Sequence, residues 1–224
     1  MERPAVDLAK EQRATKARPR YEYSGVAKTF FRSMDLLAGA TTTLFKVKLI
    51  EALAPVPYHS WESHEHHVLT RHPDEGEARA IRDWARAAKD NEYWHLRVVT
   101  EKIREDAARR PLYQTEPLPT LMVESYGGMN WVAARLGMRR AFLLNAEFED
   151  HAEHTYAALV DEHPEWEEQP VTSAVVQEHE HGPFASWADV FRRIGLDERD
   201  HMNASFRFAG RPEHVVEYEG MPEH

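Results

Sequence analysis

Cysteine is the most informative absence from this chain of 224 residues. Without it there can be no disulfide bond, thiolate zinc site, iron–sulfur cluster or cysteine nucleophile. Any bound metal ion must therefore be held by carboxylate and imidazole side chains. The sequence offers 38 acidic residues and 14 His from which such a site could be built.

Long apolar runs are also missing. No stretch of 18 uncharged apolar residues occurs, so we expect no membrane-spanning helix, and the N-terminus lacks the apolar segment of a secretory signal. The net charge of -10 argues against nucleic acid as a partner. These absences favour a cytoplasmic protein, with peripheral contact at the inner face of the cell membrane as an alternative.

The composition that is present is that of a globular protein. Hydrophobic residues make up 42% and charged residues 29% of the chain, and its length suits one domain with a full-sized core. Residues 1–24 combine basic and polar side chains with little apolar content, so we expect a mobile basic arm. We place a single helical-bundle domain at 25–210 and a C-terminal tail at 211–224.

Apolar residues recur at helical spacing in six segments, which predicts an all-α fold of about six helices. In the second segment, Pro55 and Pro57 are expected to kink or interrupt the helix. The expected helices cover residues 26–38, 43–58, 77 to about 108, 120–136, 138–161 and 185–208.

Two Glu-x-x-His pairs are the chemically most suggestive feature. Glu92 precedes His95 by three residues, and Glu198 precedes His201 by the same spacing, so each pair projects from one helix face. Both pairs fall on apolar stripes, where an uncompensated carboxylate would be costly. One such pair is common on surface helices, but two inward-facing pairs are typical of metal sites in helical bundles.

Two further acids complete a ligand set. Glu51, taken alone, reads as a surface residue paired with Lys48, whereas Glu149 is the one charge on its apolar stripe. Four Glu and two His on four helices match a ferritin-like di-iron carboxylate centre. Four carboxylates neutralise two ferrous ions, and two His leave positions open for dioxygen. We therefore predict two iron ions (Fe2+/Fe3+) bound by Glu51, Glu92, His95, Glu149, Glu198 and His201.

Four segments of the chain resemble the alternative oxidase family of di-iron ubiquinol oxidases, in order and spacing, across roughly residues 30–205. Residues 50–57, I-E-A-L-A-P-V-P, resemble the family's L-E-T-x-A-x-V-P. Residues 91–96, N-E-Y-W-H-L, resemble N-E-R-M-H-L. Residues 148–156, F-E-D-H-A-E-H-T-Y, resemble L-E-E-E-A-x-x-[ST]-Y, and 196–201, L-D-E-R-D-H, resemble A-D-E-A-H-H.

The resemblance implies roles for residues besides the six ligands. Tyr156 matches a tyrosine near the irons that takes part in redox chemistry, although its simpler interpretation is a buried, hydrogen-bonded core residue. Asn91 and Asp197 match polar positions that orient the ligands. The resemblance places a quinol beside Lys46, Ile50, Ala152 and Thr155.

The chain also departs from the family pattern. Ala52 stands where the family has Thr, Lys46 where it has Arg, and Asp150 and His151 where it has two Glu. The mean hydropathy of -0.66 is low for a family that binds one membrane leaflet through apolar helices.

The resemblance implies an oxidoreductase of electron transport that oxidises a quinol and reduces dioxygen to water without pumping protons. Two alternatives stay open: a soluble di-iron oxygenase acting on a small metabolite, and an iron-binding helical protein without turnover. The expected partners are dioxygen and a quinol. Whether the chain forms a homodimer is also open.

Overall fold

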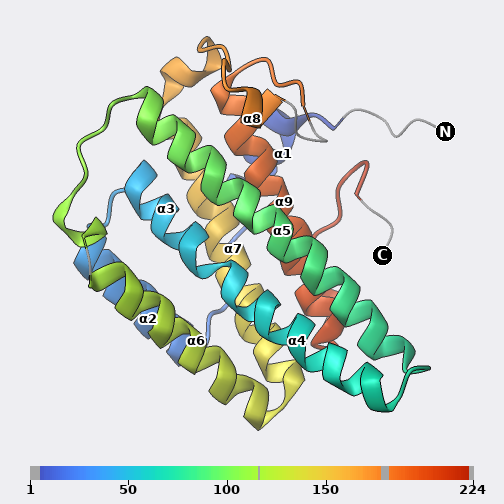
Figure 1. The fold of residues 1–224 in the computed structure, drawn as a ribbon. Helices are drawn as coiled ribbons and strands as arrows, with labels where there is room; N and C mark the ends of the chain where they lie inside the picture. Colours follow the sequence, from blue (N-terminus) through green and yellow to red (C-terminus); the bar gives the residue numbers. More distant parts are fainter. Residues whose placement is uncertain (1–5, 116, 178–181, 222–224) are drawn as a thin grey trace. The chain divides into compact units, whose positions relative to one another are not determined.

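The computed structural model describes residues 6–115, 117–177 and 182–221, and this part of the chain is all-α, with no strand. The ends of the expected arm (1–5) and tail (222–224) lie outside the described residues. The α-helices are α1 (Leu8–Ala17), α2 (Gly25–Ala38), α3 (Leu44–Leu53), α4 (Pro55–Arg71), α5 (Gly76–Glu105), α6 (Leu118–Leu136), α7 (Met138–Glu162), α8 (Ala174–Gln177) and α9 (Trp187–Phe208) (Figure 1). Three 3-10 turns are also present: η1 (Leu112–Gln114) between α5 and α6, η2 (Pro164–Glu167) between α7 and α8, and η3 (Pro212–His214) after α9.

The helical class is confirmed, but the structure holds more helices than the six expected. It adds α1, α4 and the short α8. The expected interruption near Pro55 is confirmed, because α3 ends at Leu53 and α4 begins with proline at its first position, where a missing N–H costs nothing. The ferritin-like arrangement of the bundle stays a prediction.

Local capping explains where several helices begin. The side chain of Ser24 accepts a hydrogen bond from the backbone N–H of Ala27 at the start of α2. Ser186 does the same for Asp189 at the start of α9, and Asp7 for Lys10 at the start of α1. Each cap satisfies an N–H group that the first helical turn leaves without an intrahelical partner.

The chain divides into two compact units. The first unit comprises residues 1–47 and 142–224, and the second comprises residues 48–141. Both crossings between the units fall inside helices, since α3 and α7 each contribute residues to both. The single domain expected for residues 25–210 stays a prediction.

In the first unit, α7 and α9 pack along each other through a seam of short contacts. Ala146 on α7 shares a buried apolar cluster with Met202 and Phe206 on α9. Farther along, Gly195 of α9 faces Tyr156 of α7 so closely that a Cβ added at Gly195 would lie 3.2 Å from that of Tyr156. Glycine at this position therefore lets the two helices approach.

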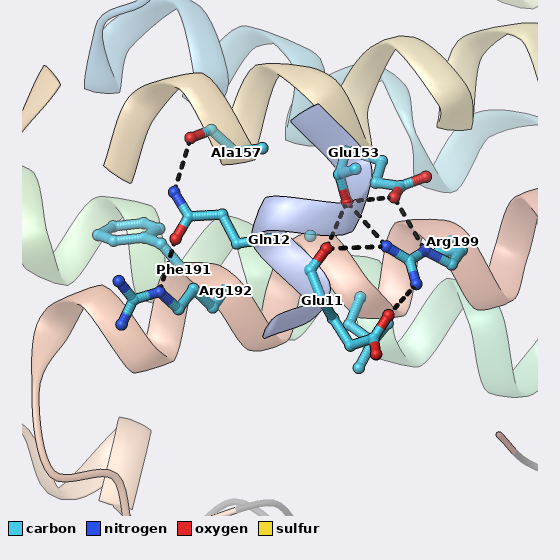
Figure 2. A pocket seen from close by; sticks show the side chains of 10 residues that line it. Glu11, Gln12, Glu153, Ala157, Phe191, Arg192 and Arg199 are labelled. Atoms are coloured by element: carbon cyan, nitrogen blue, oxygen red, sulfur yellow. Dashed lines mark hydrogen bonds and ion pairs between the residues drawn. The ribbon is translucent and has the colours of Figure 1, made fainter. Parts of the chain in front are cut away.

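Helix α1 was not expected, because residues 1–24 suggested a mobile arm. Its buried residues are all polar: Glu11, Gln12 and Thr15. They are held by hydrogen bonds to α7 and α9 instead of by apolar packing, as Figure 2 shows for Glu11 and Gln12. The expected tail is also attached, since Asn203 of α9 exchanges two hydrogen bonds with the backbone of Val216.

In the second unit, α4 and α5 lie side by side (Figure 1). Three aromatic rings join them: Trp61 stacks on Trp84 at 5.7 Å between centroids, and Tyr58 meets both rings edge-on. Gly127 of α6 leaves room for the side chain of Val56. Among the described residues, no helix has the length and apolar character needed to cross a membrane.

Candidate metal centre

Three predicted ligands come together in the second unit. Glu51 lies near the end of α3, and Glu92 and His95 lie one turn apart on α5. His95 Nδ1 is 3.1 Å from a carboxylate oxygen of Glu92 and 3.4 Å from one of Glu51. All three side chains are fully buried. The imidazole nitrogen that faces both carboxylates is therefore the one placed to bind a metal ion.

Three predicted ligands also come together in the first unit. Glu149 projects from α7, and Glu198 and His201 project from α9. One donor atom from each lies within 4.8 Å of the others, and the three side chains are buried. Of the acids in residues 147–153, Glu149 is the one that joins this group, while its role as an iron ligand stays a prediction. Its neighbours Glu147 and Glu153 are bound elsewhere, to Ser24 and Arg199 respectively.

The donor sets of both triads fit a divalent transition metal. Each triad offers two carboxylates and one imidazole, which suit iron, manganese or zinc. Two buried carboxylates near one another repel unless a cation or a proton lies between them. A metal ion would relieve this repulsion in each unit. The structure thus shows buried Glu and His groups able to hold metal, without identifying the metal.

A buried amide orients the Glu149 carboxylate in the triad of the first unit. Asn145, one turn before Glu149 on α7, donates its Nδ2 hydrogens to Glu149 Oε1 at 2.9 Å and to the hydroxyl of Ser205 on α9 at 3.1 Å. Such an outer partner fixes how a ligand points. The sequence assigned Asn145 no role. The four-residue spacing to Glu149 was the available signal.

The two positions expected to orient ligands differ in their surroundings. Asp197 is buried and accepts a 2.6 Å hydrogen bond from Arg193, whereas Asn91 is partly exposed on α5. Next to Asp197, burial raises the pKa of Asp200 to about 6, an effect that the charge of Arg193 partly offsets. Tyr218 donates to the Asp200 carboxylate at 2.8 Å, which attaches the C-terminal segment beside His201.

Tyr156 lies seven residues beyond Glu149 on α7 and is almost completely buried. Its ring stacks on that of Phe191, with centroids 6.1 Å apart and planes 22° apart. The backbone of Gly195 lies against its Cβ. The tyrosine is thus fixed by packing between α7 and α9, as both of its interpretations require.

The residues that the resemblance assigns to a quinol do not all lie in one unit. Lys46, Ala152 and Thr155 are buried in the first unit, and Ile50 is half-buried in the second. The Lys46 ammonium donates to Asp35 at 2.5 Å and to the carbonyl of Gly39 at 2.9 Å. In this structure Lys46 therefore serves to close the α2–α3 connection.

His151 marks the largest departure from the family motif. Its ring stacks on Phe31, with centroids 3.9 Å apart, and its Nδ1 accepts a hydrogen bond from Arg20 at 2.9 Å. Burial, together with the positive charge of Arg20, lowers the pKa of His151 to about 3. The imidazole is consequently neutral at physiological pH, where the family pattern has a carboxylate.

A third buried group of possible ligands, made of Asp150, Glu153 and His154, already has a cation. The guanidinium of Arg18 donates to Asp150 Oδ1 and to Glu153 Oε2, each at 2.6 Å. Beside this group, a cavity under α1 has room for about one water molecule. Figure 2 shows Glu11, Gln12, Glu153 and Arg199 around it.

Comparisons with known proteins add no relative. No protein-family model matches the chain, and a search of curated proteins gives no significant match.

Proposed function

We propose that this protein is a di-iron oxidoreductase that resembles alternative oxidase. The observation that carries the proposal is the repetition of one buried ligand set, a Glu together with a Glu-x-x-His pair, in both units. Carboxylate-rich sets with two His are those of di-iron helical proteins. The order of the four sequence motifs supports a single shared centre made from both triads.

The proposed reaction couples two quinols to one dioxygen, giving two quinones and two waters. Glu51, Glu92, His95, Glu149, Glu198 and His201 would hold the two iron ions, which would supply the redox chemistry by changing between the ferrous and ferric states. The four carboxylates of the chain balance the metal charge, and their burial excludes bulk water. Asn145 holds the Glu149 carboxylate in one orientation. We assign to the Tyr156 hydroxyl the temporary supply of one proton and one electron during dioxygen reduction. A quinol returns both, so all four electrons and four protons of the turnover still come from the two quinols.

A second candidate is a di-iron oxygenase that acts on a small metabolite. The ion pair of Lys46 with Asp35 favours it, because the ammonium assigned to quinol binding is already engaged. The quinol is therefore the less supported half of the proposed reaction. A cytoplasmic location and peripheral membrane contact likewise remain proposals.

Anaerobic loading with ferrous iron, followed by oxygen-uptake measurements with and without a short-chain quinol, tests these functions. We expect two irons per chain and oxygen uptake that depends on the quinol. Uptake that needs a different reductant would favour the oxygenase. Two bound irons without sustained uptake would favour an iron-binding protein. Binding of at most one ion per chain would contradict a di-iron centre.

A further inference from the structure

α7 and α9 pack antiparallel in a regular register. The triad of the first unit, Glu149, Glu198 and His201, lies in the middle of this contact. Asn145 pairs with Ser205 through a 3.1 Å hydrogen bond, and Glu153 pairs with Arg199 through a 2.9 Å ion pair. Both contacts are buried. Glu149 lies one turn from each of the α7 partners, and Arg199 directly follows the ligand Glu198. Two buried polar contacts between α7 and α9 therefore lie on either side of this triad.

Arg199 makes the more extensive of these two contacts, because it joins three helices. Its Nε donates to Glu153 Oε1 on α7, and its Nη1 donates to Glu11 Oε2 on α1 at 2.6 Å (Figure 2). Its Nη2 donates to the Glu11 carbonyl and to the hydroxyl of Thr15. Burial disfavours the charged guanidinium, but Glu153 and Glu11 more than offset this, so the pKa of Arg199 is raised.

The planar guanidinium suits this position. It holds fixed donors in a fork, so contacts with Glu153, Glu11 and Thr15 can form together only when the three helices keep one arrangement. Removing the arginine would leave Glu153 with Arg18 and Thr15 as partners but would take away its contact with α9. The sequence resemblance has alanine at the position of Arg199, so the tie is a feature of this chain.

We propose that Arg199 is a positioning residue, which fixes α7 against α9 at the level of Glu149 and Glu198, with α1 as its outer support. This inference rests on the proposed metal-binding function. The hydrogen bonds of Arg199 described above go to Glu153, Glu11 and Thr15, which are not predicted ligands. Arg199 acts by fixing the backbone next to Glu198 and, through Glu153, the α7 turn that follows Glu149.

Arg192 provides a matched control. It also joins α9 to α1, donating to Gln12 at 2.7 Å, but it lies six residues before Glu198 and its other partners are Glu167 and Asp189. An arginine that only attaches α1 should behave like Arg192. An arginine that positions the metal ligands should affect metal binding, whereas Arg192 should not.

The experiment is a titration of the metal-free full chain with Co2+, a visible stand-in for ferrous iron, followed by absorption spectroscopy. We expect Arg199→Gln to weaken Co2+ binding roughly 10–100-fold, as for other outer partners of metal ligands, and to alter the Co2+ bands. Arg192→Gln should leave the affinity and the bands unchanged. Arg199→Lys, which keeps the charge but not the fork, should be intermediate and serves where Arg199→Gln does not fold.

The outcomes separate the two proposals. Co2+ binding by the wild type, with equal affinities in the Arg199 and Arg192 variants, would contradict the positioning role and leave the metal site standing. Absence of Co2+ and Fe2+ binding in the wild type would contradict the metal site and the positioning role together. A melting temperature lowered equally in both variants, with affinity lost only at Arg199, would support the inference.

Discussion

In the first unit, the helix pair α7–α9 is joined by buried side-chain hydrogen bonds, whereas in the second unit the pair α4–α5 is joined by aromatic rings. Asn145 and Arg199 make the ties in the first case, and Trp61 and Trp84 in the second. Hydrogen bonds demand a fixed direction, while ring packing mainly demands volume. The ligand helices α7 and α9 of the first unit are thus joined by directional contacts in addition to apolar packing, whereas the ligand helix α5 of the second unit packs through aromatic rings on α4, which carries no predicted ligand.

The largest expected effect is common to both units, because it removes a ligand. Glu92→Ala in the second unit and Glu198→Ala in the first should each reduce iron below two per chain and abolish oxygen uptake. In each case the remaining carboxylates would repel one another wherever metal is lost. Iron analysis and an oxygen electrode provide the measurements. Glu77→Ala, at an exposed position of α5, is the control and should retain both properties.

The next effect should distinguish the units by stability. Trp61→Ala removes the stacked ring between α4 and α5 and should cost about 3–5 kcal/mol of unfolding free energy. Asn145→Ala breaks the polar tie in the first unit and should cost about 1–3 kcal/mol, mainly by leaving a buried partner unsatisfied. Urea unfolding measures both. A smaller loss of unfolding free energy for Trp61→Ala than for Asn145→Ala would contradict the view that ring packing stabilises the second unit more than this hydrogen bond stabilises the first.

Tyr156→Phe tests chemistry in the first unit while preserving packing. The ring still stacks on Phe191, so iron content should be unchanged. If the hydroxyl takes part in dioxygen reduction, oxygen uptake should fall more than tenfold, and tenfold corresponds to about 1.4 kcal/mol of barrier. Unchanged uptake at full iron content would make Tyr156 a core residue and weaken the transfer of the oxidase mechanism. The six-ligand site would be unaffected.

The smallest expected effect concerns a surface contact in the second unit. Hydrogen bonds from Lys89 at 2.5 Å and Arg86 at 2.8 Å lower the pKa of Glu62 from 4.5 to about 2. Because the folded-state pKa is depressed, this contact stabilises the fold above pH 4.5, and the benefit disappears as the pH falls toward 2. Glu62→Gln should therefore cost about 1 kcal/mol or less near pH 7. The difference from wild type should shrink in acid, and a constant difference would contradict the ion-pair explanation.

The periodicity of apolar residues predicted most of the helices, because α2, α5, α6, α7 and α9 each bury a stripe. It could not reveal α1, whose buried residues Glu11, Gln12 and Thr15 are polar and leave no apolar pattern. It also missed most of α4, where His64, His66 and His67 are exposed on a continuous helix and the charged residues around them leave little apolar pattern.

The ligands were predictable for a related reason. Glu149 and Glu198 interrupt apolar stripes, and an interruption of this kind is visible in the sequence. The tie between Glu153 and Arg199 joins residues 46 positions apart, and each alone resembles any surface charge. Nothing in local spacing could pair them. The long-range hydrogen bonds that hold the site, such as the one between Arg199 and Glu153, therefore became visible only in the structure.

The polar attachment of α1 has a consequence for how its release would be detected. Heat capacity and denaturant sensitivity both rise with the apolar surface that becomes exposed, and the buried side chains of α1 are those of Glu11, Gln12 and Thr15. Detachment would expose these polar side chains together with the apolar groups of α7 and α9 that line the cavity under α1, such as Ala157 and Phe191. We therefore expect a smaller calorimetric and urea signal than for an apolar helix of the same length. Amide hydrogen exchange across residues 8–17 would report any opening of α1 directly, whatever the size of the calorimetric signal.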